Sequence, residues 1–188
     1  MNSLLIMLIL ISIPAFIVLI FVALIYNILV YRRNAADNVF STIDVMLKKR
    51  YDLIPNLVET VRGYASHEKE TLAKISEMRA RAVSDSTGVN EKISLDGEIT
   101  NAIGRIFAIA ENYPNLKANG QFLNLQKNLS DMEEQIAAAR RAYNAAVTDF
   151  NNSCEMFPTN IFASLFNFEK KKLFQVSDNE KQPVKAIP

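Results

Sequence analysis

The stretch LLIMLILISIPAFIVLIFVALI, residues 4–25, decides the fold of this 188-residue chain. It contains no charged side chain, and only Ser12 and Pro14 interrupt its apolar character. A helix of about 22 residues covers the ~30 Å hydrocarbon core of a bilayer, and proline is tolerated in membrane helices. The sequence therefore predicts a transmembrane anchor over residues 4–31, after a short external N-terminus at residues 1–3.

A cleaved signal peptide is the alternative interpretation of this run. Such a peptide has a basic leading region, an apolar core of about 7–15 residues and a small-residue cleavage site. Here residues 1–3 (MNS) are not basic, the apolar run is longer, and residues 26–31 (YNILVY) contain no such cleavage site. We therefore expect an uncleaved, single-pass anchor.

The basic residues near the anchor predict its orientation. Residues 1–3 contain none, whereas Arg32 and Arg33 follow the anchor directly and Lys48, Lys49 and Arg50 come soon after. Lys and Arg are enriched on the cytoplasmic side of membrane helices. We expect the N-terminus outside and the C-terminal domain in the cytoplasm, which is a reducing compartment that suits a chain with one cysteine.

The composition of the remaining chain favours helices and excludes a strongly basic nucleic-acid-binding protein. The whole chain has 21 basic and 20 acidic residues, five glycines and six prolines. Alternating strand patterns are missing, and helix-forming residue types are abundant. Residues 32–168 are long enough for one small helical domain with its own core.

Apolar residues recur at helical spacing in several segments of this domain, most regularly over residues 122–150. Breakers at Pro55, residues 84–90 and residues 112–120 separate the segments. The pattern predicts helices at 32–51, 55–83, 91–111 and 120–154, packed as an antiparallel up-and-down four-helix bundle. In the alternative, Pro55 only kinks one long helix that continues from the anchor.

The segment after the last helix combines aromatic and basic residues, including Phe162, Phe166 and Phe168 followed by Lys170, Lys171 and Lys172. In a bundle of four helices, this segment returns to the membrane. The aromatic rings then either contact an anionic membrane surface or cap the open end of the bundle core. We expect residues 169–188 to form a basic, disordered tail.

Polar residues at the expected helix ends are candidates for contact with a partner or with lipid: Lys48, Lys49, Arg50, Tyr51 and Tyr113. Recognition often depends on polar groups in loops and at helix ends. The alternative is that these residues only serve turn chemistry and solvation of the helix ends.

Glu68 is a candidate for a buried polar pair. It falls within the apolar stripe between Tyr64 and Leu72. We expect it to pair across the bundle with Arg140, and Arg79 and Arg141 are the alternatives. Buried pairs of this kind can specify helix register. The alternative is that Glu68 extends into water.

His67 is the only histidine, and it is the first residue to test for chemistry. Its surroundings faintly resemble a phosphoacceptor box, but Leu72 stands where that box has proline. The chain also has no glycine-rich ATP-binding domain. A bundle metal site needs more than one histidine, and Cys154 has no base near it in the sequence. We therefore expect no enzyme activity, no cofactor, no catalytic residues and no metal site.

Five motifs lie in a fixed order along the chain: FSTIDV at 40–45, RYDLIPNLV at 50–58, AENYPNLKAN at 110–119, IAAARRAYN at 136–144 and FP at 157–158. In order and spacing they resemble the LemA family of bacterial membrane proteins. The resemblance implies an inner-membrane protein with an outside N-terminus and a cytoplasmic domain of antiparallel helices. It implies no established activity, cofactor or substrate. Asn115 and Asn167 depart from the family pattern, where Asp and Gly are common.

These observations predict a membrane-anchored helical scaffold or adaptor that binds a protein partner or assembles with itself at the inner face of the membrane. The alternative is a membrane-organising protein that acts on lipid through its anchor and its aromatic-basic C-terminal segment. A remote alternative is phosphotransfer or metal binding through His67. Nucleic acid is not an expected partner, and no small-molecule substrate is identified.

Overall fold

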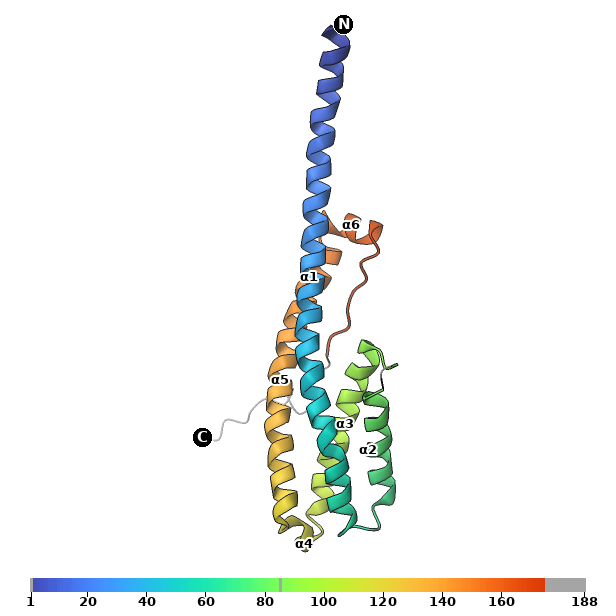
Figure 1. Cartoon of the computed structure of the whole chain (residues 1–188), viewed down its shortest axis with the longest axis vertical. Coiled ribbons are helices and arrows are strands. Elements are labelled where there is room, and N and C mark those ends of the chain that lie inside the picture. Colours follow the sequence, from blue (N-terminus) through green and yellow to red (C-terminus); the bar gives the residue numbers. More distant parts are fainter. Residues whose placement is uncertain (1, 85, 175–188) are drawn as a thin grey trace, which may run out of the picture. The chain divides into compact units, whose positions relative to one another are not determined.

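The computed structural model describes residues 2–84 and 86–174 and is helical throughout, with no strand in these ranges. The elements, labelled in Figure 1, are α1 (Asn2–Arg62), α2 (Lys69–Ala82), α3 (Val89–Ala110), α4 (Pro114–Lys117), α5 (Gly120–Glu155) and α6 (Thr159–Leu165). The predicted all-α class and the long apolar N-terminal helix are confirmed.

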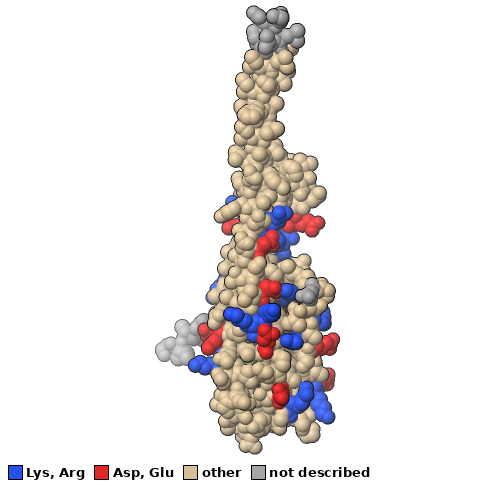
Figure 2. Space-filling model, viewed as in Figure 1, with Lys and Arg blue, Asp and Glu red and all other residues tan. Residues whose placement is uncertain are grey.

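The N-terminal part of α1 is apolar on all sides. Its large side chains from Met7 to Leu24 are mostly exposed, among them Leu10 and Leu19, which are about two-thirds exposed. Figure 2 shows an uncharged surface over this part of the chain. A helix that is apolar all round suits a membrane span, and α1 is long and apolar enough to cross a membrane.

The chain divides into two compact units, and α1 and α5 contribute residues to both. The first unit contains residues 1–39 and 144–172, and the second contains residues 40–143 and 173–188. In α1, one stripe of buried residues repeats at steps of three, four or seven: Ile25, Leu29, Ala36, Ile43, Leu47, Arg50, Ile54, Leu57 and Val61. This spacing keeps the stripe on one face of the helix.

In the second unit, residues 40–62 of α1 lie alongside α2, α3 and residues 120–143 of α5 (Figure 1). The core between these helices includes Leu57 of α1, Ile75 of α2, Ile99 of α3 and Ile136 of α5, all fully buried. The side-chain amide of Asn119 begins α5 by accepting hydrogen bonds from the N–H groups of the second and third helical residues, at 2.8 and 3.0 Å.

The predicted helix break at Pro55 is wrong, because α1 continues through this residue to Arg62. Proline lacks the N–H that would bond the carbonyl of Tyr51, four residues earlier. The Nε of Arg79 in α2 donates a long hydrogen bond to this carbonyl instead, at 3.4 Å. A side chain from a neighbouring helix therefore compensates for the proline.

The predicted helix 55–83 is interrupted at residues 63–68, between α1 and α2. The carbonyl of Val61 accepts hydrogen bonds from the N–H groups of Tyr64 and Ala65, at 3.0 and 2.8 Å, and these bonds form the turn. Ala65 is fully buried, and the amide of Asn119 donates to the Tyr64 hydroxyl at 2.9 Å. By contrast, α3 and α5 lie within two residues of the predicted ranges 91–111 and 120–154.

The short helix α6 ends in a left-handed residue, Asn167, with φ of 54°. The N–H of Phe168 bonds the carbonyl of Ala163 at 2.9 Å, and the N–H of Asn167 bonds that of Ser164 at 3.3 Å. This pair of bonds is the Schellman motif, in which glycine or asparagine is favoured at the left-handed position. The motif explains physically why Asn stands at a position where glycine also fits.

The expected disordered tail began at residue 169, but residues 169–174 are described and make specific contacts. The side-chain amide of Asn151 donates to the carbonyl of Lys171 and accepts from its N–H group, at 2.9 Å each. Phe174 is buried and packs edge-on against Tyr143, with ring centroids 5.3 Å apart. Residues 175–188 of the expected tail lie outside the described residues.

Candidate functional site

Four charged side chains form a closed cluster inside the second unit, which we call the ion cluster: Arg50 of α1, Asp96 of α3, and Glu133 and Arg140 of α5. Arg50 pairs with Asp96 and, at 2.7 Å, with Glu133. Arg140 pairs with the same two carboxylates, at 2.6 Å to Asp96 and 3.2 Å to Glu133. Each guanidinium therefore contacts both acids, and the cluster is neutral overall.

The ion cluster is withdrawn from water. Arg50 and Asp96 are at most 1% exposed and Arg140 is 9% exposed, whereas the Glu133 side chain retains 35%. Thr100 adds a hydroxyl that accepts from Arg50 at 2.9 Å. Burying charges is unfavourable unless each is paired and hydrogen-bonded. Every charge of the cluster is paired, although the buried Nε atoms of Arg50 and Arg140 have no hydrogen-bond partner among the described residues.

The surroundings of the ion cluster shift two protonation equilibria. Burial lowers the pKa of Arg50, but the negative charges of Asp96 and Glu133 together raise it by more. The pKa of Arg50 therefore lies above the ordinary value. Burial raises the pKa of the neighbouring Tyr51 to about 12, although the charge of Arg50 opposes this shift. The Tyr51 hydroxyl has no hydrogen-bond partner among the described residues. Both groups therefore keep their protons at neutral pH.

The ion cluster joins three helices and exposes little of itself to a ligand. Its buried charges neutralise one another, and both of its carboxylates are engaged by guanidinium groups. Its physical effect is to fix how α1, α3 and α5 are aligned, since a shift of any helix would leave a charge unpaired in the core.

The structure changes the assignment of several predicted contact residues. Arg50 and Tyr51 are buried, so their predicted role in contacting a partner or lipid is wrong. Lys48 and Lys49 are exposed on α1. Tyr113 is half-buried at the start of α4.

The predicted partner of Arg140 is also corrected. Arg140 is buried and paired as expected of such a residue, but its partners are Asp96 and Glu133 rather than Glu68. Glu68 is half-buried at the N-terminus of α2, where it precedes the first helical residue. His67 lies exposed in the adjoining turn rather than on a helix. Among the described residues, no group of three or more His, Cys, Asp or Glu is placed to hold a metal ion.

We did not predict the ion cluster, although the sequence contains a signal for it in the spacing of its arginines relative to buried apolar residues. Arg50 continues the stripe of Leu47 and Ile54 at steps of three and four, and Arg140 continues that of Ile136 in the same way. A charged residue at such a step is a candidate for a buried pair. Because Arg50 follows Lys48 and Lys49 directly, its charge suggested a solvated helix end.

In the first unit, the predicted aromatic residues pack against α1. Phe162 lies edge-on to Phe21, with centroids 6.3 Å apart, and Phe166 lies edge-on to Tyr26 at 5.1 Å. Phe168 also contacts Tyr26, at 5.9 Å. These rings therefore join α6 and the turn after it to the apolar part of α1.

Two of the three lysines at 170–172, which we predicted as lipid or partner contacts, form ion pairs with acidic side chains of the protein. Lys170 pairs with Glu155 at 2.7 Å, and Lys171 pairs with Asp37 at 2.6 Å. Lys172 is exposed. The guanidinium of Arg33 lies 5.3 Å from the centre of the Phe168 ring, in cation–π contact.

Four apolar side chains are exposed on and just before α6, within the segment expected to contact the membrane or to cap the bundle, and we call them the α6 apolar face: Met156, Phe157, Ile161 and Leu165. Their exposed fractions are 63%, 80%, 56% and 67%. Ile161 and Leu165 stand four residues apart within α6, and this spacing was the available sequence signal.

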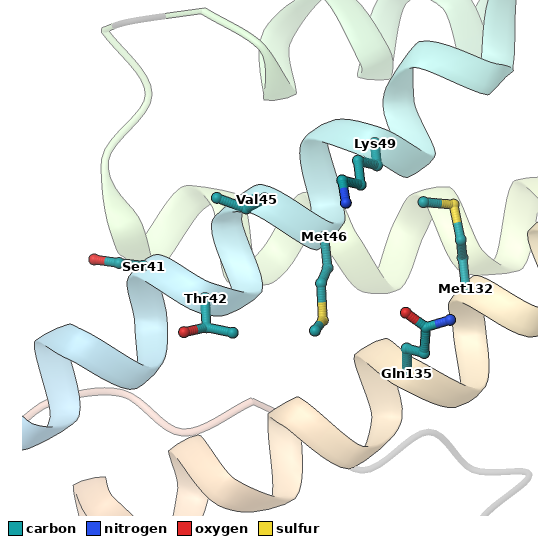
Figure 3. A pocket seen from close by; sticks show the side chains of 7 residues that line it. All are labelled: Ser41, Thr42, Val45, Met46, Lys49, Met132 and Gln135. Atoms are coloured by element: carbon teal, nitrogen blue, oxygen red, sulfur yellow. The ribbon is translucent and has the colours of Figure 1, made fainter.

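The second unit also has a shallow groove of about 400 Å³ between α1 and α5. Figure 3 shows its lining, which is Ser41, Thr42, Val45, Met46 and Lys49 from α1 with Met132 and Gln135 from α5. The two methionine side chains extend into the space between the helices (Figure 3). Methionine is flexible and adapts to apolar partners of different shape.

Comparison with known proteins agrees with the family resemblance. The model of the LemA family matches residues 39–186. Protein LemA of Metamycoplasma hominis is 29% identical, over 84% of this chain and 72% of that protein. Magnetosome protein MamQ 2 of Paramagnetospirillum magneticum is 26% identical, over 80% of this chain and 64% of that protein. Magnetosome protein MamQ of Magnetospirillum gryphiswaldense is 25% identical, over 79% and 64%. Because the family match covers most of its length, the chain belongs to the LemA family.

Proposed function

We propose that this protein is a membrane-anchored helical adaptor without catalytic activity. Residues 4–31 cross a bacterial inner membrane once, with the N-terminus outside. Residues 40–143 form an antiparallel four-helix bundle in the cytoplasm, and this bundle binds a protein partner or further copies of the chain. Relatives that carry the name magnetosome protein fit a role at a membrane.

The observation that carries the proposal is the continuity of α1. One helix includes both the exposed apolar segment and residues of the second unit's core, from Ile43 to Val61. A bundle whose first helix is also its anchor works only at a surface. The anchor is therefore part of the function and does more than determine where the protein is located.

The chemistry of the second unit supports binding rather than catalysis. Its buried charges are paired with one another in the ion cluster. Catalytic acids and bases instead need access to substrate and a proton to exchange near neutral pH. The exposed methionine-lined groove and the exposed Lys48 and Lys49 are surfaces that a protein can contact.

Amine-reactive crosslinking in intact cells tests the binding function, because Lys48 and Lys49 are exposed. We expect products larger than the monomer, and we expect the same assembly to survive extraction in mild detergent. The matched control replaces both lysines by arginine, which keeps the charge and removes the amines at these two positions. A chain that is monomeric in detergent and forms no crosslinked product in the membrane would overturn the proposal.

Cysteine labelling tests the orientation. In a Cys154→Ser background, a cysteine at position 3 should react with a membrane-impermeant maleimide in intact spheroplasts. A cysteine replacing the exposed Lys74 of α2 should react only after permeabilisation. Labelling in the opposite pattern would reverse the proposed topology.

A further inference from the structure

We propose that the α6 apolar face inserts into the interface of the same bilayer that α1 crosses, as a second and monotopic membrane contact. This inference rests on the proposed membrane anchoring by α1. It names the membrane, rather than a protein, as the partner of this face.

The first reason is the amount of apolar surface that α6 leaves uncovered. The four members of the α6 apolar face are all more than half exposed, although α6 itself has only seven residues. Apolar surface exposed to water is unfavourable, and large exposed apolar patches mark interaction sites. The opposite face of α6 is already occupied, since Ala163 packs in one buried cluster with Ile25 and Leu29.

The second reason is the position of α6 along α1. Its contacts run from Phe21 to Leu29, and the apolar run ends at Ile25. Phe21 and Ile25 are four residues apart, about 6 Å along a helix. Helices that lie in a membrane interface bury their apolar face by about 5–10 Å. The α6 helix therefore contacts α1 where the spanning segment meets the interface.

The third reason is that exposed apolar side chains of α1 lie where α6 contacts it. Phe21, which contacts Phe162 of α6, is itself 48% exposed, and Leu24 on the next turn is 56% exposed. If α1 crosses the bilayer, these two side chains face acyl chains. A protein covering the α6 apolar face would have to displace lipid from α1 as well, whereas the bilayer covers both surfaces at once.

Charged residues lie on the C-terminal side of the part of α1 that α6 contacts. Arg32, seven residues after Ile25, donates to the carbonyl of Asp149 at 2.9 Å and to the hydroxyl of Ser153 at 2.7 Å. Lys170 and Lys171 are each paired with an acid. The cations near α6 are thus engaged within the protein. We therefore expect insertion to depend on apolar burial and to need no anionic lipid.

Tryptophan fluorescence tests the inference, because the chain contains no tryptophan of its own. Single reporters are placed by Leu165→Trp on the α6 apolar face, by Ile13→Trp in the anchor and by Lys74→Trp on exposed α2. Each full-length variant is reconstituted in phosphatidylcholine vesicles with brominated acyl chains, which quench tryptophan on contact. A second measurement uses iodide in the aqueous phase.

We expect brominated lipid to quench the Leu165→Trp and Ile13→Trp reporters, and iodide to quench only the Lys74→Trp reporter. Quenching at position 13 without quenching at position 165 would overturn this inference and leave the anchor in place. If position 165 were also protected from iodide in that case, a protein surface would be covering the face. Absence of lipid quenching at both positions would overturn the anchoring itself. Phe157→Trp repeats the test at the most exposed member of the face.

Discussion

Charged side chains are usually exposed and large apolar side chains are usually buried. The two units of this protein depart from this rule in opposite ways. The second unit buries two arginines and an aspartate at 9% exposure or less, whereas the first exposes many large apolar side chains by more than half, among them the four of the α6 apolar face. In the second unit, the protein itself compensates for the buried charges, because each of them has a partner of opposite charge. In the first unit, no described part of the chain covers the exposed side chains.

This difference shows what each unit is built to meet. A neutral, closed cluster of charges needs nothing from outside and fixes the alignment of helices. An open apolar face remains unfavourable until something apolar covers it. The second unit is therefore self-sufficient in its core, whereas we interpret the first unit as a structure completed by the membrane.

Removing the central carboxylate should break the ion cluster most severely. In Asp96→Ala, two buried guanidiniums lose a shared partner, and we expect a loss of about 3–5 kcal/mol in the free energy of unfolding. Urea unfolding followed by circular dichroism in detergent measures it. A loss below about 1 kcal/mol would mean that the cluster is solvated rather than buried.

Replacing the whole buried set distinguishes alignment from stability. In the triple variant Arg50→Met, Asp96→Leu and Arg140→Met, no buried charge remains, and Glu133 keeps its contact with water. Apolar replacement of buried ion pairs is often neutral or stabilising by about 1–4 kcal/mol. We expect the triple variant to regain the stability that Asp96→Ala loses. A triple variant as unstable as the single one would show that the charges themselves supply the stability.

Alkaline pH should also weaken the second unit, through Tyr51. Its folded pKa of about 12 lies above the ordinary value of about 10. Its contribution is therefore fully present below about pH 10 and is lost as the pH rises through 12. Two pKa units correspond to about 2.7 kcal/mol. Unfolding free energies measured between pH 8 and 12 test this expectation.

The matched control for this titration is Tyr51→Phe. Because the Tyr51 hydroxyl has no partner among the described residues, its removal should leave the stability at pH 8 nearly unchanged. The variant should then lose less stability than the wild type on the way to pH 12, since the other tyrosines titrate equally in both. Identical pH profiles for the two proteins would show that Tyr51 is not shielded from water.

A smaller effect is expected at the end of α6, which orients the α6 apolar face. Asn167 is left-handed, and this conformation is unfavourable by about 1–2 kcal/mol for residues with a restricted side chain. Asn167→Val should therefore loosen α6, and Asn167→Gly should hold it at least as well. Hydrogen exchange of peptides covering residues 159–168 measures the change. Equal protection in both variants would contradict the role of the left-handed cap.

The fold was predictable wherever the local sequence alone determines it. The apolar run of α1 and the regular stripe of α5 both specify helices without help from other parts of the chain. The left-handed cap after α6 was not predicted, although Asn167 stands at a position that favours glycine or asparagine. These features depend on spacing and on backbone preference, which one sequence contains.

The features that we missed depend on contacts between distant residues. The helix survives Pro55 because Arg79, 24 positions later, reaches the free carbonyl of Tyr51. Arg50 is buried because Asp96 and Glu133 meet it from two other helices. A single sequence shows that Arg50 stands on a buried stripe, but it does not show which acids neutralise it.

The smallest expected effect concerns the exposed ion pair beside Pro55 and sharpens the contrast with the ion cluster. Asp52 and Arg79 are 3.6 Å apart, and their side chains are 57% and 32% exposed. Exposed pairs of this kind contribute about 0.2–1 kcal/mol, so Asp52→Ala should fall in that range. Arg79→Ala also removes the hydrogen bond to the Tyr51 carbonyl, which adds about 1 kcal/mol. Urea unfolding of both variants beside Asp96→Ala should therefore rank Asp52 below Arg79 and Arg79 below Asp96. If Asp52→Ala destabilised the protein as much as Asp96→Ala, burial would not be what separates the two pairs.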